Sequence, residues 1–587
     1  MGVGVSVLAF GNSLGSPDFF VQEYDNLHHL GITQGYLSWG NWSSFQNTMY
    51  PIPSEAEQGP FDYLGFYPSA WSCLAAMAGQ LTGASAAMAE NAVNFALTAV
   101  AFPVSMHCFM RTAFASRPSI VPFGAVVCLA FTAFPWALFV FGPLYPNVLA
   151  FSLLPVMAAS FIAIFRLGAR RKERILFACA FCLGVASCVF TQPNAVFTVG
   201  VLLVPFCVHR LACWGASPRA PRLGVRVLLC VIFVAAVAVL WVVLFNLPFL
   251  NGVTSYWWPT VRTLPEAVYD ALSASYRMDS PQIVPSLLVL VGFGAAFRHR
   301  GFLWMSFSWL LACAIYVIAA ACDGPFKQLV VGFWYSDSLR VASFAAIAAI
   351  PLAAMGLWLV ARGVLRAAEW VRSHMDGMRQ HEGGRRARLG SKAAVIAACA
   401  VAVALGVAIY RPGNAAVDYQ EGDGAFPHMI SVLRGMYDSS RDNVYDSDER
   451  AFVQKVKEIV PEGEMVLNVP DDGSAFAYAA DGLNAYYRYL SDYDTDYERQ
   501  GSRLIRNGLS SIAENDEVKE AVRQSGTEYV LLLDQGDGEG FRGRRYFFTY
   551  EDGWRWQGIL SVADDTPGFE VVLSEDDMRL YRITVLD

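Results

Sequence analysis

The stretch PDFFVQEYDNLHHLGITQGYLSWGNWSS, residues 17 to 44, is polar and aromatic, whereas most of the chain around it is apolar. It opens a segment that ends in FDYLGFYPSAWS, residues 61 to 72, where the sequence becomes apolar again. If Tyr24 to Gly31 is helical, Asp25 and His29 stand four residues apart on one face. A carboxylate beside an imidazole suits proton transfer or metal binding, but such pairs are often structural. Both interpretations stay open at this point.

The composition is that of a membrane protein. The chain has 587 residues, of which 55% are hydrophobic, and a mean hydropathy of +0.36. Arginines collect in short connectors between apolar runs, and acidic residues collect after Asp418, so the net charge of -8 is unevenly distributed. This distribution is typical of a polytopic membrane protein and gives no indication of a nucleic-acid partner.

Hydropathy predicts the membrane spans, because a bilayer core requires about 20 apolar residues per helix. The first run, GVGVSVLAF at 2–10, is too short to span alone and counts as a partial span. Residues 70–81 are predicted to form a re-entrant or interfacial helix. The expected full spans lie at 88–110, 119–141, 147–166, 175–191, 194–209, 223–247, 283–297, 302–321, 338–361 and 392–410.

Basic residues occur at every second connector, as the positive-inside rule requires. They lie near 111–117, 166–174, 209–226, 298–300 and 362–392. The alternate connectors, including 248–282 and 322–337, are therefore expected on the outer side, together with everything after Arg411. We accordingly predict a helical bundle with a large first outer loop (11–69) over residues 1–410, and an extracytoplasmic α/β domain over residues 411–587.

The periodicity after Arg411 is that of an α/β domain. ERAFVQKVKEIV at 449–460 predicts an amphipathic helix, and GEMVLNV at 463–469 and TEYVLLLD at 527–534 predict strands. FEVVLSEDDMRLYRIT at 569–584 predicts a hairpin with its turn at Glu575 to Asp577. Asp471 and Asp472, followed by Gly473, indicate either a turn or a metal-binding loop.

Four predicted outer segments carry a resemblance. They are YDNLHHL at 24–30, FYPSAW at 66–71, FWYSDSLR at 333–340 and VPDDGSAFAYAADG at 469–482. Together they resemble an actinobacterial family of large multi-spanning membrane proteins, whose architecture looks like that of the C superfamily of membrane glycosyltransferases (GT-C). The resemblance covers nearly the whole chain. It implies a mostly α polytopic membrane protein, a GT-C-like helix bundle with a C-terminal extracytoplasmic α/β domain.

The resemblance also implies a function: transfer of a sugar from a polyprenyl-phosphate carrier to a cell-envelope glycan or protein, at the outer face of the cell membrane. In such enzymes an acidic residue of the first outer loop acts as base or binds a metal. Here that residue is Asp25, with His29 as its partner or as a second ligand of a divalent ion, Mg or Mn. The candidate substrate-binding residues are Glu23, Tyr24, Tyr67, Trp71, Trp257, Trp258, Tyr335, Asp337 and Arg340.

Several of these residues have a second interpretation. Trp257 and Trp258 suit a membrane-interface belt as well as sugar stacking. Asp337 and Arg340 lie three residues apart and would form a local ion pair on a helix, although Arg340 also suits a lipid phosphate. The alternative function is a non-enzymatic envelope protein of the same fold, either a glycan or lipid transporter or an assembly protein.

Overall fold

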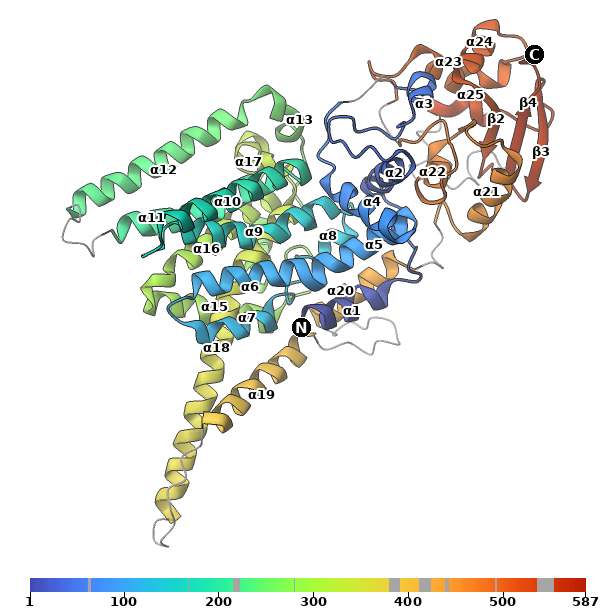
Figure 1. The fold of residues 1–587 in the computed structure, drawn as a ribbon. Helices are drawn as coiled ribbons and strands as arrows, with labels where there is room; N and C mark the ends of the chain where they lie inside the picture. The colour runs from blue at the N-terminus through green and yellow to red at the C-terminus, as the bar shows by residue number, and fades with distance from the viewer. Residues whose placement is uncertain are drawn as a thin grey trace. The chain divides into compact units, whose positions relative to one another are not determined.

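The computed structural model in Figure 1 describes residues 1–61, 65–166, 168–214, 222–278, 280–379, 391–410, 424–438, 443–490, 493–535 and 554–586. Parts of two predicted basic connectors (215–221 and 380–390) and the start of the predicted outer domain (411–423) lie outside the described residues. The chain forms two compact units. The first comprises Met1–Ser13, Phe95–Phe141 and Tyr145–Arg434, and the second comprises Leu14–Asn94, Gly142–Leu144 and Gly435–Asp587.

The protein is a multi-pass membrane protein. Within its described residues, seven helices are long and apolar enough to cross a membrane: Ala86–Ala113, which joins α5 (Ala86–Ala96), a π turn (Leu97–Ala101) and α6 (Phe102–Ala113); α9 (Tyr145–Ile164); α10 (Arg171–Thr191); α11 (Asn194–Ala212); α12 (Leu223–Phe245); Arg300–Ala321, which includes α16 (Leu303–Ala321); and Ser338–Ala367 of α18 (Ser338–Arg379). Shorter apolar helices are α1 (Gly2–Ala9), α7 (Val121–Val127), α15 (Ile283–Arg298) and the last residues of α19 (Ser391–Tyr410).

Burial separates the central helix of the first unit from the peripheral ones. In α18, 89% of the most apolar stretch is buried, whereas α12 has no fully buried residue, so α12 lies at the periphery of the unit. Helix α15 packs against α18 at two glycines. A Cβ at Gly292 would lie 1.9 Å from the Leu352 oxygen, and one at Gly356 would lie 2.0 Å from the Leu288 oxygen. Only glycine allows the two backbones to approach this closely.

Most spans begin and end within a few residues of the prediction, but the single span predicted at 119–141 is wrong. Helix α7 ends at Val127 and a short α8 (Ala137–Val140) follows after a turn. The Gln282 side chain satisfies backbone groups of this break. Its Oε1 accepts a 3.1 Å hydrogen bond from the Thr132 amide, and its Nε2 donates one of 2.9 Å to the Ala130 oxygen. Hydropathy does not reveal such a partner, because it counts apolar residues alone.

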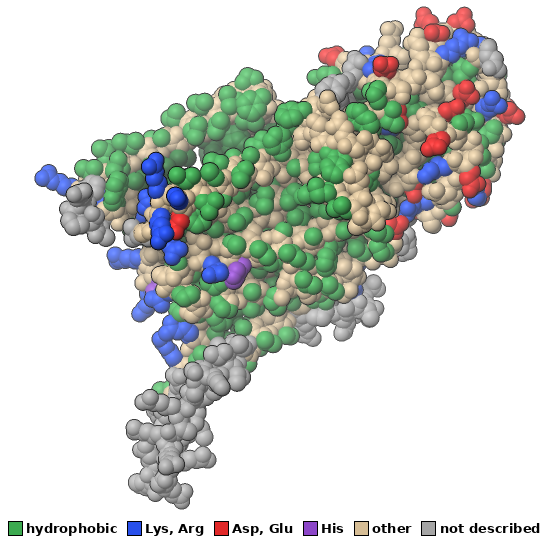
Figure 2. Space-filling model, viewed as in Figure 1, with side chains coloured by type: hydrophobic (Ala, Val, Ile, Leu, Met, Phe, Trp, Pro, Cys, Tyr) green, Lys and Arg blue, Asp and Glu red, His purple; other side chains and the backbone are tan. Residues whose placement is uncertain are grey.

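The predicted inner connectors come together at one end of the first unit. Figure 2 shows Lys and Arg side chains gathered where α10 begins. Arg117 and Arg362 lie over the ring of Trp358, at 5.9 and 4.7 Å, and Arg117 also reaches His299 Nδ1 at 3.4 Å. The predicted outer connectors 248–282 and 322–337 contact each other as well, through a 2.8 Å hydrogen bond from Lys327 to the Trp258 carbonyl. The alternation is therefore present in the bundle, while the side that faces the cytoplasm stays a prediction.

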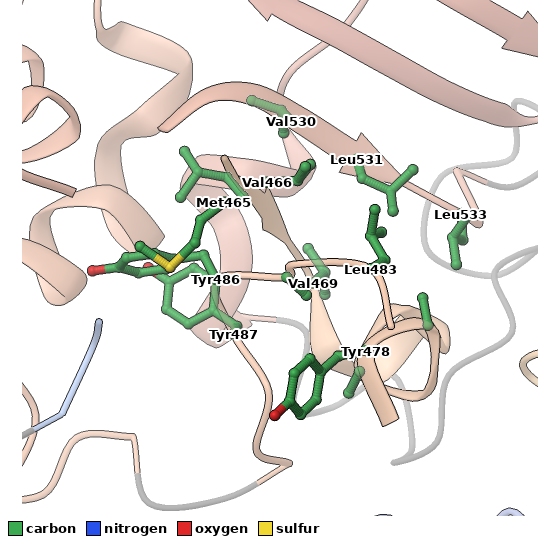
Figure 3. Packing of buried hydrophobic residues seen from close by; sticks show 14 of the residues in the cluster. Met465, Val466, Val469, Tyr478, Leu483, Tyr486, Tyr487, Val530, Leu531 and Leu533 are labelled. Carbon is green, nitrogen blue, oxygen red and sulfur yellow. The ribbon is translucent and has the colours of Figure 1, made fainter. Parts of the chain in front are cut away.

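Among the described residues, the C-terminal part of the second unit forms a small four-stranded sheet. Its order is β1 (Met465–Asn468), β2 (Thr527–Leu532), β4 (Met578–Ile583) and β3 (Phe569–Glu575). β1 and β2 are parallel, and β3 and β4 form the predicted hairpin. The predicted helix is confirmed as α21 (Ser447–Ile459). Figure 3 shows the apolar side chains of β1 and β2 packed with residues of the segment from Tyr478 to Tyr487, which explains why both strands are apolar runs.

The second unit also contains the first loop, which the predicted division at residue 410 assigned to the bundle. Apolar side chains of α2 (Tyr24–Trp39) and α4 (Ala70–Thr82) belong to the same core as the sheet. Buried Arg488 ties the two parts together, with its guanidinium 3.0 Å from Glu55 Oε2 and stacked on the rings of Tyr50 (4.6 Å) and Tyr478 (4.1 Å). The described part of the first loop therefore packs on the sheet domain.

Candidate active site

A cavity of about 370 Å³ lies in the second unit, and the first turns of α2 form one of its walls. Tyr24, Asp25 and His28 line it from α2, Tyr67 lines it from the segment before α4, and Tyr489 from the C-terminal part of the chain. Its lining thus combines a carboxylate, an imidazole and several aromatic rings. The volume lies at the lower end of the range for ligand sites, roughly 300 to 1,000 Å³.

Asp25 is held at the start of α2 by Gly142, a residue from a distant part of the chain. The Asp25 amide donates a 3.1 Å hydrogen bond to the Gly142 oxygen. Gly142 has a φ of 104°, and a Cβ at this position would lie 2.7 Å from Asp25 Oδ2. The first turn of a helix also stabilises a negative charge. Asp25 is therefore a well-positioned carboxylate at the cavity wall.

His28 is the imidazole that shares the cavity with Asp25. Its ring meets the Tyr67 ring edge-on at 4.5 Å and lies 6.2 Å from the ring of Tyr489. Burial lowers the pKa of His28 to about 4, so the ring is neutral at pH 7. Its Nε2 is shielded from solvent and has no hydrogen-bond partner among the described residues. A neutral imidazole with an unused nitrogen is suited to hydrogen bonding with a ligand.

His29, the predicted partner of Asp25, lies elsewhere. It is buried, its ring is 5.7 Å from that of buried Trp71, and neither residue lines the cavity. Glu23 is the N-cap residue of α2 and is not part of the lining either. The predicted helix is present, but the neighbour of Asp25 in the cavity is three residues away rather than four. Spacing could not distinguish the two, since both positions share a helix face with Asp25.

The wall formed by Tyr489 is fixed by hydrogen bonds to the first loop. The Met49 amide donates to the Tyr489 hydroxyl oxygen at 3.0 Å. The Tyr50 hydroxyl donates to the Tyr486 carbonyl at 2.6 Å and accepts from the Arg488 amide at 3.2 Å. These bonds join the loop to the segment that carries Tyr489, so the cavity depends on both parts of the unit.

A second group of predicted residues lies in the first unit, at the turn before α18. Asp337 is buried, its Oδ1 accepts a 2.8 Å hydrogen bond from the Leu339 amide, and its Oδ2 lies 3.7 Å from Arg340 Nη1. The predicted ion pair is therefore present. The Arg340 guanidinium also lies over the Tyr335 ring at 4.5 Å, and its Nε has no hydrogen-bond partner in the described part of the chain. Burial raises the pKa of Asp337, against the opposing charges of Arg340 and Arg277.

Two further cations, which sequence reasoning missed, lie near the same carboxylate. The charges of Arg277 and Lys327 both interact with Asp337. Lys327 is buried, and Arg277 lies over the ring of Phe141 at 5.5 Å. Together with Arg340, three cations interact with the buried Asp337 carboxylate, and Lys327 interacts with Asp323 as well. A group of cations of this kind suits an anionic group such as a phosphate. Arg277 and Lys327 are basic residues in connectors predicted to be outer. This departure from the positive-inside rule was the signal available in the sequence.

The backbone around Arg277, Lys327 and Arg340, which we call the cation group, adopts conformations that are costly for residues other than glycine. Tyr335 and Ser336 have φ values of 59° and 56°, and Tyr276 and Arg277 have values of 43° and 71°. Such residues concentrate at functional sites, where the surrounding structure holds them in place. The two turns that carry Arg277 and Arg340 therefore adopt backbone conformations that their own residues disfavour, and the surrounding structure holds them in place.

The two predicted tryptophans differ in their surroundings. Trp258 packs on the ring of Phe141 at 5.7 Å, and its carbonyl accepts the hydrogen bond from Lys327. The Trp257 side chain is 53% exposed, which is typical of a residue at a membrane interface. Trp258 thus contributes to the cation group, whereas Trp257 fits the aromatic belt.

The predicted metal sites gain no further ligands. In the part of the chain that the structure describes, no three His, Cys, Asp or Glu residues come together as a metal-binding group. Because His29 does not line the cavity, the pair Asp25 and His29 does not by itself fit a resident Mg or Mn ion, and the need for a metal stays a prediction. Asp472 lies in a turn and accepts 2.9 Å hydrogen bonds from the Ser474 and Leu533 amides, as expected of a structural turn.

The model of the family described as "Family of unknown function (DUF6541)" matches residues 1–585. The chain belongs to this family. No curated protein matches it in sequence. The family match extends over Asp25, His28 and Arg340 alike, so both candidate groups belong to the part shared with the family. The actinobacterial source stays a prediction.

Solved structures of similar fold exist. ArnT from Cupriavidus metallidurans in the apo state has a TM-score of 0.52 at 13% identity, covering 100% of this chain and 97% of ArnT. The ArnT structure bound to undecaprenyl phosphate has a TM-score of 0.51 at 13% identity, covering 100% and 98%. An Archaeoglobus fulgidus oligosaccharyltransferase tethered with an acceptor peptide has a TM-score of 0.48 at 10% identity, covering 91% and 68%. The chain therefore has an ArnT-like fold, mostly helical with a small C-terminal sheet domain, which confirms the predicted fold class.

Proposed function

We propose that the protein is a membrane glycosyltransferase that moves a sugar from a polyprenyl-phosphate carrier to a cell-envelope glycan or protein on the extracytoplasmic side. The fold that it shares with ArnT supports the proposal, since one ArnT structure is bound to undecaprenyl phosphate. The observation that carries it is Asp25, whose backbone amide is hydrogen-bonded to Gly142 and whose side chain lies at the wall of a ligand-sized cavity.

In the proposed reaction Asp25 is the general base. Its carboxylate takes the proton of an acceptor hydroxyl while the hydroxyl oxygen forms a bond to the anomeric carbon of the donor sugar. The bond from that carbon to the phosphate oxygen breaks, and its electron pair leaves with the polyprenyl phosphate. Attack opposite to the leaving group inverts the anomeric configuration. A positioned base of this kind contributes a rate factor of roughly 100 to 10,000.

The cation group of the first unit binds the phosphate in this proposal. The guanidinium of Arg340 supplies directional hydrogen bonds, and Lys327 and Arg277 add positive charge. The buried Asp337 carboxylate holds Arg340 near the turn and offsets part of the charge when no phosphate is bound. Stabilising the leaving phosphate lowers the barrier to breaking the anomeric bond.

The sidedness follows from the basic end of the first unit. The positive-inside rule assigns that end, which includes Arg117 and Arg362, to the cytoplasm. By the alternation of the connectors, the connector that carries Lys327, the start of α18 that carries Arg340 and the C-terminal segment are then extracytoplasmic. This is also the side on which an envelope acceptor is found.

The deciding experiment replaces the base. Asp25→Asn keeps the size of the side chain and removes its proton affinity, so sugar transfer should fall by roughly a hundredfold or more while the protein still folds. The assay measures transfer of labelled sugar from polyprenyl-phosphate donors by purified protein in lipid nanodiscs. The matched control is Asp516→Asn, since Asp516 is exposed in the first turn of α24 (Asp516–Ser525) and lines no part of the cavity.

The outcomes separate the candidate functions. Full activity in Asp25→Asn would remove Asp25 as the base. A folded wild-type protein that transfers sugar from none of the donors would favour the non-enzymatic alternative, a glycan or lipid transporter or an assembly protein.

A further inference from the structure

We infer that the cavity of the second unit binds an uncharged, hydroxyl-bearing sugar unit of the acceptor, and that His28 is the residue that helps to select it. The inference rests on the proposed function, because it names the kind of acceptor whose hydroxyl Asp25 would deprotonate. It adds a ligand class and a specificity-determining residue.

The charge of the lining carries the first step. Among the described residues that line the cavity, neither Lys nor Arg is present, and Asp25 contributes a carboxyl group. A phosphate or carboxylate on the ligand would therefore find no cation among the described lining residues. Removing an anion from water without a compensating cation is costly. An anionic ligand is therefore disfavoured.

The hydrogen-bonding capacity of His28 carries the second step. Its neutral ring lines the cavity, and its Nε2 has no partner among the described residues. Buried polar atoms nearly always have a partner, so an unused nitrogen beside a cavity indicates one that the ligand supplies. A hydroxyl group can donate to one ring tautomer and accept from the other, whereas an ionised oxygen can only accept.

The remaining lining suits the other faces of a sugar. Tyr67 is packed edge-on against His28, and the hydroxyl of Tyr489 is fixed by the Met49 amide, so both rings are held in place. Rigid aromatic rings provide flat apolar surfaces for the C–H groups of a sugar ring. Asn47 adds an amide to the lining. The volume of about 370 Å³ suits a single small unit rather than a long glycan segment.

The contrast with the first unit supports this assignment. There, the charges of Arg277, Lys327 and Arg340 all interact with Asp337, and these cations suit a phosphate. Within its own unit, each group suits a different ligand: the cations of the first unit suit an anionic phosphate, and the cavity of the second unit suits an uncharged sugar.

The experiment measures binding directly. Full-length protein in lipid nanodiscs, free of sugar-based detergent, is titrated by ligand-observed NMR with neutral methyl glycosides of glucose, galactose, mannose and arabinose. Methyl glucuronide, glucose 6-phosphate and mannose 6-phosphate are the anionic counterparts. We expect at least one neutral glycoside to bind at least tenfold more tightly than its charged counterpart. Equal or tighter binding of the charged compounds, or binding of none of the neutral ones, would overturn the inference.

The variants test His28 itself. His28→Phe keeps a ring beside Tyr67 and should weaken binding of the neutral glycoside at least tenfold, while His28→Asn, which retains a donor and an acceptor, should weaken it less. His209→Phe, in α11 and outside the lining, is the control. Thermal unfolding checks that each variant folds. Unchanged binding in a folded His28→Phe would remove His28 from the site.

The same protein separates this inference from the proposed function. Selective binding of neutral glycosides without transfer from any donor would leave the cavity assignment in place and remove the glycosyltransferase. If the wild type transfers sugar but His28→Phe does not weaken glycoside binding, the glycosyltransferase function would stand. The assignment of His28 to the cavity's ligand would then be removed.

Discussion

The Gly142 oxygen accepts a hydrogen bond from the Asp25 amide, and the absence of a side chain on Gly142 leaves the space that the Asp25 carboxylate occupies. Positions 25 and 142 are far apart in the sequence, yet the proposed base depends on this contact. The φ of 104° at Gly142 places the backbone in a region that other residues rarely adopt. Gly142 is thus a positioning residue for Asp25.

Gly142→Ala should lower sugar transfer by roughly tenfold to a hundredfold, because the new Cβ would lie 2.7 Å from Asp25 Oδ2 and displace the carboxylate. The backbone strain should also lower the free energy of unfolding by about 1 to 2 kcal/mol. Gly463→Ala is the matched control. Its φ is 93° and a Cβ there meets nothing within 4 Å, so it carries the strain without the contact. Equal losses of transfer in both variants would show that strain alone is responsible.

Local patterns in the sequence predicted the elements well. The helix at 449–460, the two apolar strands and the terminal hairpin are present because each is determined by its own periodicity. The spans likewise follow from hydropathy, except at 119–141, where the Gln282 side chain stabilises a break in the helix.

Long-range relationships were not predictable from one sequence. The first loop shares a core with the C-terminal sheet, but the sequence of α2 does not show which segment its apolar side chains contact. Asp25 was correctly placed in a helix, yet spacing could not show that His28 rather than His29 lines the cavity. Nothing near Gly142 in the sequence indicates its contact with Asp25. Each of these features depends on segments that meet only in the folded chain.

Arg340→Gln should raise the KM for the polyprenyl-phosphate donor by roughly tenfold or more, because hydrogen bonds to a charged group contribute about 1.5 to 3 kcal/mol. The control is Arg362→Gln. Both arginines lie over an aromatic ring, Arg340 over Tyr335 at 4.5 Å and Arg362 over Trp358 at 4.7 Å, so both variants lose a cation–π contact. Steady-state kinetics at varied donor concentration measure the KM of Arg340→Gln and of Arg362→Gln. Parallel changes in the two variants would count against a phosphate site at Arg340.

Arg488→Ala should lower the free energy of unfolding by about 3 to 5 kcal/mol, because it leaves the carboxylate of Glu55 in a buried site without its cation. The Arg488 side chain is fully buried and also stacks on Tyr50 and Tyr478. Arg503→Ala is the control, since the Arg503 side chain is 43% exposed and its ion pair with Glu498 is screened by water. Thermal unfolding of the full-length protein measures both. A loss below about 1 kcal/mol for Arg488→Ala would show that the first loop packs on the sheet domain without it.

Asp472 should make the second unit less stable as the pH rises from about 4 to 7. Burial raises the pKa of Asp472 from 3.8 to about 7 in the folded protein. Below pH 4 the carboxyl is protonated in both states, so it has no effect. Between pH 4 and 7 the unfolded chain releases the proton while the folded chain keeps it, so stability falls, by at most about 4 kcal/mol. Above pH 7 the loss is constant.

Asp472→Asn cannot ionise and should remove this slope, although it loses an acceptor for the amides of Ser474 and Leu533. The measurement is the difference in unfolding midpoint between wild type and variant at each pH, with exposed Asp516→Asn as control. A difference that does not change between pH 4 and 7 would show that Asp472 is ionised in the folded protein throughout that range.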